Sequence, residues 1–160
     1  MSTLVANGGA PAAAANPPPE APIANDGFWP DIDVAKLRAS TRLTGNVTPE
    51  RLRKEVIDAV LSVNGELAIY KAKMVGEGWS SADDIGESID GSRELVHRYL
   101  RAVSCRVQAA FADGYRDWDN TRAGDYRADF ESIAADDFRR NARWAISDIL
   151  GIGRSTVDLL

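Results

Sequence analysis

Apolar residues recur at helical spacing along most of the chain, with short polar breaks between the segments. After Pro49, the steps of three and four residues that mark one face of an α-helix are kept by Leu52, Val56, Val60, Val63, Leu67, Tyr70 and Met74. Thr48, Pro49 and Glu50 form a typical helix start, because the Thr48 hydroxyl can cap free backbone N–H groups and proline fits the first turn. The pattern predicts a long amphipathic helix that ends near Gly76 or Gly78.

Two more segments toward the C-terminus show the same spacing. A helix predicted to start at Ser92 carries, on or beside one face, Leu95, Tyr99, Ala102, Val103, Arg106, Ala109 and Ala110. A final helix from about Asp125 to Leu150 places inward Phe130, Ile133, Ala134, Phe138, Ala142, Ala145 and Ile149. Gly151 is the natural stop of this helix, because glycine readily adopts the left-handed conformation that ends helices.

A short helix precedes the long ones. Asp31 or Asp33 can cap it, and it extends to about Arg42, where the polar stretch TGNVTP interrupts the chain. We find no pair of alternating segments joined by a hairpin turn, so the sheet content is expected to be near nil. The sequence predicts an all-α fold: a small antiparallel bundle of three long helices plus one short N-terminal helix, with extended N- and C-terminal arms.

Composition divides the chain into three parts. Residues 1–25 hold eight Ala and five Pro, with Glu20 as their one charge, and such a segment lacks the apolar bulk to offset its chain entropy. We predict a disordered Pro/Ala-rich arm over residues 1–25, a helical bundle domain over 26–150 and an extended tail over 151–160. Deleting a solvated arm should leave stability unchanged; the alternative is an arm that orders against a partner.

Charge and cysteine content limit the possible functions. The net charge is −5, which argues against a free-standing, sequence-independent DNA binder, because such proteins are usually basic. Arg outnumbers Lys by 15 to four, and guanidinium groups suit bidentate contacts at interfaces. The single cysteine, Cys105, excludes an intramolecular disulfide. We find neither a membrane-spanning apolar run nor a signal peptide, so we expect a protein made and used without secretion and without membrane contact.

The sequence offers no recognisable active site. His97 is the one histidine, so a Glu-x-x-His di-metal site would need at least one more, and a Ser/His/Asp arrangement would depend on this residue. We expect His97 at the surface or at an interface. Acidic residues cluster in residues 77–90 and 113–131, but carboxylates on polar helix faces and loops are solvated by default. We predict no catalytic residues, no metal site and no cofactor.

Residues 84–101, DIGESIDGSRELVHRYLR, allow a different function. They resemble a helix-turn-helix whose second helix would present Arg93, His97 and Arg101 to a DNA major groove. Asp90-Gly91 stands where that motif has a glycine followed by a buried aliphatic residue, and the acidic surroundings would repel phosphate. A DNA-binding regulator that uses residues 84–101 is the alternative function.

Another stretch carries a resemblance to a known family. Phe28-Trp29-Pro30-Asp31-Ile32-Asp33 resembles the aromatic-aromatic-Pro-Asp-Ile-Asp motif of the head completion (GPL) proteins of temperate, contractile-tailed phages. Similar blocks follow in order at Arg42-Leu43, Val47-Thr48-Pro49-Glu50-Arg51-Leu52-Arg53, Asn64-Gly65-Glu66-Leu67 with Tyr70, Ile89-Asp90-Gly91, Tyr99-Leu100-Arg101-Ala102-Val103, Tyr115, Asp119 with Thr121, Gly124, Ala128-Asp129 and Arg143-Trp144-Ala145. The chain departs from the family pattern at Gly65, where alanine is usual, and at Ile152-Gly153, where a Lys-Pro pair is usual.

The resemblance implies a structural virion protein at the head–tail junction, assembled in the host cytoplasm, with no catalysis and no cofactor. Such proteins bind the portal vertex after DNA packaging, retain the genome and prepare the head for tail attachment. The implied partners are the portal protein, further copies in a portal-matched ring (a dodecamer by the resemblance), and a tail-side neck or tail completion protein. Double-stranded DNA would pass through the channel without sequence-specific binding.

Candidate contact residues follow from residue type and from the resemblance. Trp and Arg dominate interface energetics, and we expect Trp29, Trp79, Trp118 and Trp144 to be exposed. The candidate portal or partner contacts are Phe28, Trp29, Trp144, Arg154, Val157, Leu159 and Leu160. For Phe28 and Trp29, the alternative is packing across the bundle's own groove. The C-terminal tail either adds as an extended strand to a partner's sheet or folds back onto its own bundle.

Overall fold

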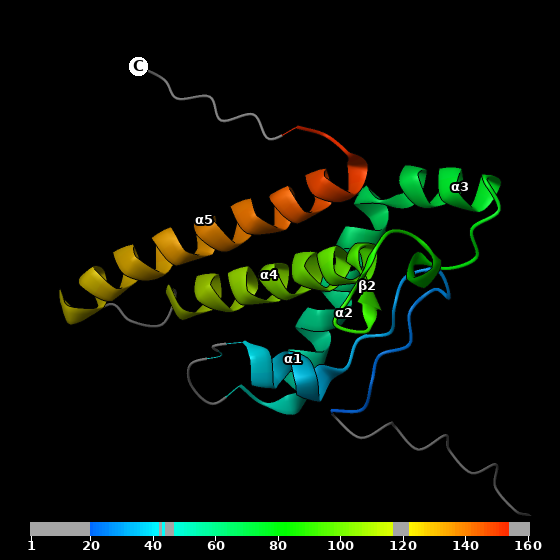
Figure 1. Cartoon of the computed structure of the whole chain (residues 1–160). Coiled ribbons are helices and arrows are strands. Elements are labelled where there is room, and N and C mark those ends of the chain that lie inside the picture. Colours follow the sequence, from blue (N-terminus) through cyan, green and yellow to red (C-terminus); the bar gives the residue numbers. More distant parts are fainter. Residues whose placement is uncertain (1–19, 42, 44–46, 117–121, 154–160) are drawn as a thin grey trace, which may run out of the picture.

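A computed structural model of the chain describes residues 20–41, 43, 47–116 and 122–153, with the backbone alone described for residues 115, 116 and 122–134. In chain order its elements are α1 (Val34–Ser40), α2 (Pro49–Glu66), α3 (Ala68–Gly76), the 3₁₀ helix η1 (Ala82–Asp84), β1 (Ser88–Ile89), β2 (Ser92–Arg93), α4 (Glu94–Arg116) and α5 (Arg122–Leu150). The described chain is mostly helical, and the all-α prediction is confirmed (Figure 1).

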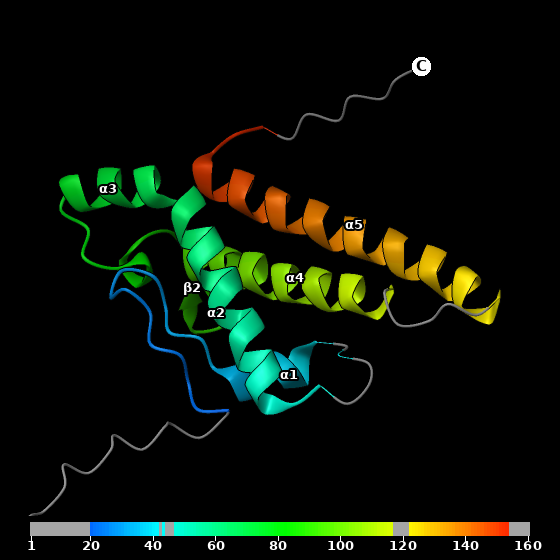
Figure 2. The same cartoon turned by 180° about the vertical axis from the view of Figure 1, so that it is seen from behind.

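The helices pack around α4. Helices α4 and α5 lie side by side as an antiparallel pair, and α2 crosses α4 on another face (Figure 1 and Figure 2). The prediction of three antiparallel long helices therefore differs from the structure, because α2 crosses the pair instead of lying along it. The core lies where the helices meet, and its fully buried side chains include Leu52, Val56, Val63, Tyr99, Val103 and Val107.

The predicted helix starts are confirmed at two places. Asp33 precedes α1, and its carboxylate accepts a hydrogen bond from the backbone N–H of Lys36 at 2.9 Å. Thr48 precedes α2, and its hydroxyl accepts a hydrogen bond from the N–H of Arg51 at 3.3 Å. Local residue types therefore determine where α1 and α2 begin.

The end of α5 at Gly151 is also confirmed. Gly151 has a φ of +68°, and the N–H of Ile152 donates to the carbonyl of Ser147 at 2.9 Å, as in a Schellman motif. The predicted inward side chains Ala142, Ala145 and Ile149 are buried, and Phe138 is half-buried. The other predicted inward side chains of α5 lie outside the described side chains: Phe130, Ile133 and Ala134.

The helix predicted after Pro49 is two helices in the structure. Leu67 separates α2 from α3 with a φ of −94° and a ψ of 4°, and its side chain is fully buried. Gly65 weakens the helix here by about 1 kcal/mol relative to alanine. The turn lets Tyr70 and Met74 of α3 pack against the core, while the other side of α3 faces solvent, with Ile69 87% exposed.

A two-stranded hairpin occupies the place of the helix-turn-helix considered for residues 84–101. Strands β1 and β2 pair antiparallel, with Ser88 opposite Arg93. The turn residues Asp90 and Gly91 have φ values of +49° and +77°, and Asp-Gly favours a turn of this kind. Residues 85–91 form no helix, so the helix-turn-helix alternative is wrong. The expectation that the chain has no hairpin turn is wrong as well, although the strands are only two residues each.

The packed body begins closer to the N-terminus than predicted. Ile23 is buried and forms an antiparallel bridge with Ile32 through two backbone hydrogen bonds of 2.8 and 2.9 Å. The Arg53 guanidinium of α2 donates to the carbonyl of Ala21 at 2.7 Å. The boundary predicted at residue 25 is therefore wrong, because proline does not prevent extended pairing and Ile23 supplies apolar area to bury. Residues 1–19 lie outside the described part.

Candidate interaction surfaces

Trp29 lies at the centre of an aromatic cluster that joins the N-terminal segment to two helices. Its ring stacks on Tyr99 of α4 at a centroid distance of 4.7 Å and on Tyr70 of α3 at 6.3 Å. The ring of Phe28 meets it edge-on at 5.0 Å. Such ring pairs each contribute about 0.5–1.5 kcal/mol beyond their area burial, so this aromatic cluster (Phe28, Trp29, Tyr70 and Tyr99) fixes the segment against α3 and α4.

Two asparagines and the Tyr99 hydroxyl form a closed polar network beside the aromatic cluster. The Tyr99 hydroxyl donates to Asn64 Oδ1 at 2.7 Å and accepts from Asn25 Nδ2 at 2.9 Å. Asn64 Nδ2 donates to Asn25 Oδ1 at 2.9 Å. Burial raises the pKa of Tyr99 to about 12. The hydroxyl is therefore protonated at neutral pH and can donate its hydrogen bond. The network ties residue 25 to α2 and α4.

Asp26 holds the backbone that presents the two aromatic side chains. Its Oδ1 accepts hydrogen bonds from the N–H groups of Phe28 and Trp29 at 3.1 and 3.0 Å, and its Oδ2 pairs with the Lys71 ammonium at 2.8 Å. Burial raises the pKa of Asp26, but the hydrogen bonds from Lys71, Trp29 and Phe28 outweigh it and hold the pKa below its ordinary value. The carboxylate is therefore ionised at neutral pH and fastens this turn to α3.

The expectation that Trp29 is exposed to a partner is wrong. Phe28 is 3% exposed and Trp29 is 2% exposed, so the alternative of packing in the chain's own groove describes both rings. The physical reason is that Tyr70 and Tyr99, distant in sequence, offer a flat apolar surface on which the indole stacks. Phe28 and Trp29 therefore cannot contact a partner directly, and their role is to hold the body together.

Large exposed apolar side chains are spread over α2, α3, β1, α4, α5 and two loops. The large ones are Ile57 at 38%, Leu61 at 65%, Ile69 at 87%, Val75 at 51%, Trp79 at 42%, Ile89 at 56%, Leu100 at 36%, Leu150 at 36% and Ile152 at 58% exposure. Trp79 is exposed as expected, and Trp118 lies outside the described residues. Apolar side chains scattered singly over a surface are common in folded proteins, so their number alone defines no contact surface.

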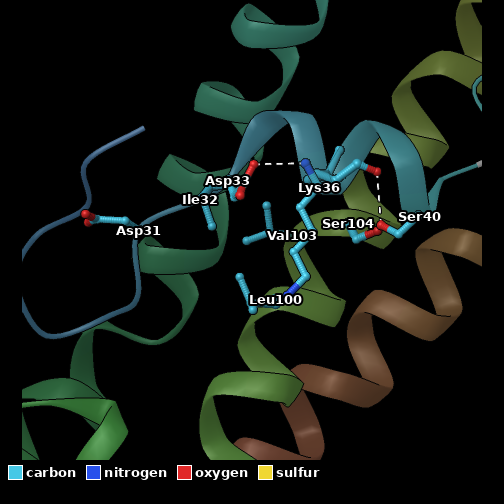
Figure 3. Close-up of a pocket in the computed structure, with 9 residues that line it drawn as sticks. Asp31, Ile32, Asp33, Lys36, Ser40, Leu100, Val103 and Ser104 are labelled. Atoms are coloured by element: carbon cyan, nitrogen blue, oxygen red, sulfur yellow. Dashed lines mark hydrogen bonds between the residues drawn. The ribbon is translucent and has the colours of Figure 1, made fainter. Parts of the chain in front are cut away.

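A pocket of about 310 Å³ lies between α1 and α4 (Figure 3). Its apolar lining comes from Ile32, Leu37, Leu100 and Val103, and its polar lining from Asp31, Asp33, Lys36, Ser40 and Ser104. Apolar walls with a charged margin suit the side chains of another protein segment. We call this feature the α1–α4 pocket.

Trp144 of α5 is half-buried, and the Arg140 guanidinium lies over its ring at 5.0 Å from the centroid. Arg139 pairs with Asp113 of α4 and with Asp136, which fastens α5 to α4. Trp144 therefore stays a candidate contact residue on a partly exposed side of α5. The remaining candidates lie outside the described residues: Arg154, Val157, Leu159 and Leu160.

The residues proposed to read DNA hold the acidic loop instead. Arg93 donates from Nε to the carbonyl of Asp83 at 3.1 Å and from Nη1 to that of Gly86 at 3.2 Å. The ring of His97 is exposed, as expected, and its Nε2 donates to the carbonyl of Ile89 at 2.8 Å. The His97 contact joins the hairpin to α4, and the Arg93 contacts join it to the loop before it. Together they occupy two of the three side chains that a recognition helix would need.

Sequence reasoning missed the role of Asn25 and Asp26. One local signal was present, because Asp and Asn side chains often accept hydrogen bonds from N–H groups two residues later. Asp26 does this with Phe28. The partners of Asn25 on α2 and α4 had no such signal.

The described residues contain no group of three or more His, Cys, Asp or Glu side chains that could hold a metal ion. Within the same part of the chain, no helix has both the length and the apolar character needed to cross a membrane.

Comparison with known proteins places the chain in one family. The sequence profile of the phage head completion protein (GPL) family matches residues 23–160. A head completion/stabilization protein of Escherichia phage P2 is 34% identical over 136 residues, which cover 84% of this chain and 80% of that protein. No solved structure matches the chain.

Proposed function

This chain belongs to the phage head completion protein (GPL) family, whose members are structural proteins of the phage head, and we propose that it acts at the portal vertex. In this proposal it binds the portal after DNA packaging, retains the genome and prepares the head for tail attachment. The family membership carries the proposal: the matched region starts at residue 23, where the packed body also starts.

The fold supports the same role through the residues that carry the resemblance. Phe28 and Trp29, Asn64, Tyr70 and Tyr99 come from separate blocks of the family pattern, and they meet in the aromatic cluster and its polar network. These blocks therefore maintain the body of the protein. Contacts with other proteins are left to its surface and its ends.

The proposed partners are the portal protein, further copies of this chain in a portal-matched ring of twelve, and a tail-side neck or tail completion protein. Double-stranded DNA passes through the channel of the ring without sequence-specific binding. The net charge of −5 favours this, because like charges repel the phosphate backbone. The ring assembles in the host cytoplasm and becomes part of the virion, and it needs neither catalysis nor a cofactor.

The C-terminal tail is the proposed portal contact. It leaves α5 at Gly151, and Ile152 is 58% exposed, so the chain here is directed away from its own core. Arg154, Val157, Leu159 and Leu160 supply one cation and three aliphatic side chains for an extended segment that adds to a partner's sheet. Trp144 is the proposed contact on α5 itself.

Deletion of the gene and reconstitution with purified portal rings test this function. We expect phage particles that package DNA, lose it and fail to join tails when the chain is absent. Purified portal rings mixed with the chain should give a complex with a second ring below the portal, visible by electron microscopy. Heads that keep their DNA and join tails without this chain would contradict the proposal.

A further inference from the structure

Two uncovered surfaces lie on different sides of the body. One is the outer side of α2, and the other is the α1–α4 pocket. On α4, Tyr99 and Arg106 meet α2, whereas Leu100 and Ser104 line the pocket. At about 100° per residue, Leu100 and Ser104 point roughly a third of a turn around α4 from the line that faces α2. The outer side of α2 and the mouth of the pocket therefore face different directions.

The outer side of α2 carries two exposed aliphatic side chains. Ile57 and Leu61 lie one turn apart. At about 100° per residue, Ile57 is roughly a third of a turn from the buried Val56, and Leu61 is nearly opposite it. Lys54 and Asp58 are on the same side and form an ion pair at 3.0 Å. The surface is thus a pair of aliphatic side chains beside Lys54 and the two carboxylates that pair with it, Asp58 and Glu55.

The α1–α4 pocket has the complementary form. An aliphatic side chain of four carbons fills on the order of 100 Å³, at roughly 30 Å³ per heavy atom, so a cavity of about 310 Å³ accepts the ends of two. Ile32, Leu37 and Val103 give it an apolar floor, and the three are almost fully buried. The outer side of α2 offers two such side chains.

One cation and one anion on each surface match in sign and spacing. On α2, Lys54 precedes Asp58 by four residues, and on α1, Asp33 precedes Lys36 by three. Both spacings correspond to about 5–6 Å along a helix. Among the described residues, no ion pair engages Lys36. Aligned in parallel, the two helices bring Lys54 opposite Asp33 and Asp58 opposite Lys36.

We propose that a second copy of this chain occupies the pocket: Ile57 and Leu61 on α2 of one copy enter the α1–α4 pocket of the next. This inference rests on the proposed ring and names its subunit contact. Because the two surfaces differ and face different directions, the contact is heterologous and can repeat from copy to copy until a ring closes. The apolar pair forms the centre of the contact and the two ion pairs form its margin.

Charge reversal tests the pairing between Asp58 and Lys36. Asp58→Lys and Lys36→Asp each place like charges across every contact of the ring, and like charges at an interface strongly disfavour association. We expect each variant to lower the yield of infectious particles by at least about tenfold. The double variant D58K/K36D restores opposite charges at each contact and should recover most of the yield. Single variants without effect, or a double variant no better than the singles, would overturn the proposal.

Leu61→Asp tests the apolar centre, with Ile69→Asp as its matched control. Both side chains are exposed, so neither change should alter the melting temperature. Leu61→Asp should abolish ring formation on purified portal rings, and Ile69→Asp on α3 should leave it unchanged. A ring of normal occupancy with Leu61→Asp would overturn the proposal.

Disulfide trapping separates this inference from the proposed function. On a Cys105→Ala background, Lys36→Cys with Asp58→Cys should give a ladder of linked copies after oxidation, while either cysteine alone gives no ladder. A ladder without portal binding would contradict the proposed function and keep the contact. Portal binding without a ladder would contradict the contact and keep the proposed function.

Discussion

The sequence pattern and the observed burial disagree in two regions, and they disagree in opposite ways. The regions are the N-terminal segment of residues 21–32 and helix α3. The first borders a Pro/Ala-rich stretch and has no helical pattern, yet Ile23, Phe28 and Trp29 are buried. The second continues a regular apolar pattern, yet Met74 is the buried residue of α3, and Ile69 is 87% exposed. Periodicity indicated the helix correctly in α3 but did not indicate which apolar side chains would be covered.

The two regions differ in how much of their surface packs against the rest of the chain. Residues 21–32 pack against α2, α3 and α4 of the same chain, through Arg53, Asn64, Tyr70 and Tyr99. A nine-residue helix such as α3 is marginal by itself in water, and here it is fastened by Tyr70, Lys71 and Met74. Its outer side is exposed to solvent. The contrast is between a segment that the fold requires and a helix that the fold leaves half uncovered.

The largest effect on stability is expected for Trp29→Ala. The indole is 2% exposed and stacks on two tyrosines, so its removal leaves a cavity in the core and should cost about 3–5 kcal/mol. Trp79→Ala is the matched control, because Trp79 is 42% exposed, and it should cost less than about 1 kcal/mol. Urea unfolding measures both. Equal losses for the two variants would show that the aromatic cluster does not support the body.

Deletion of residues 1–25 should have the next largest effect. It removes the buried Ile23 and the hydrogen bonds of Asn25, so we expect a loss of about 3 kcal/mol from apolar burial and hydrogen bonding. Deletion of residues 1–19 keeps these contacts and should leave the unfolding free energy unchanged. The comparison locates the start of the body by thermal melting. Two deletions of equal stability would support the boundary first expected at residue 25.

Local signals account for what could be predicted from the sequence. The caps Asp33 and Thr48 and the stop at Gly151 act within a few residues, so residue type alone revealed them. The Asn25 network joins residues 39 and 74 positions apart, and no local pattern encodes such pairs. The contact residues were the hardest to predict from the sequence. Trp29 is of a residue type that is common at interfaces, yet it is buried in the core.

Tyr99→Phe should lower stability by about 1–2 kcal/mol. The ring and its stacking stay, but the part-buried Asn64 Oδ1 loses its donor. Asn25 Nδ2 loses one of its two acceptors and keeps the Pro30 carbonyl. Combining it with Asn64→Ala in a double-mutant cycle should give a loss smaller than the sum of the two single losses. Additive losses would mean that the hydroxyl and Asn64 contribute independently.

Asp26→Asn should give a smaller loss that depends on pH. The folded state holds the pKa of Asp26 below its ordinary value of 3.8, so the ionised carboxylate contributes stability that is fully present above that value. This contribution is lost as pH falls through the lowered pKa of the folded state. The difference in stability between wild type and variant should therefore be present at pH 7 and shrink in acid. Lys71→Gln should reproduce the same trend, and a difference that grows in acid would contradict it.

Truncation after Gly153 should have the smallest effect on stability and a large effect on assembly. The cut keeps Ile152, whose N–H bonds to the Ser147 carbonyl, so the end of α5 stays intact and the melting temperature should not change. If the tail is the portal contact, the truncated chain no longer binds purified portal rings. Full-length L159D/L160D should reproduce this defect, since charges replace the apolar side chains of the proposed contact. A truncated chain that binds portal rings as wild type does would move the portal contact to the body, with Trp144 as the next residue to test.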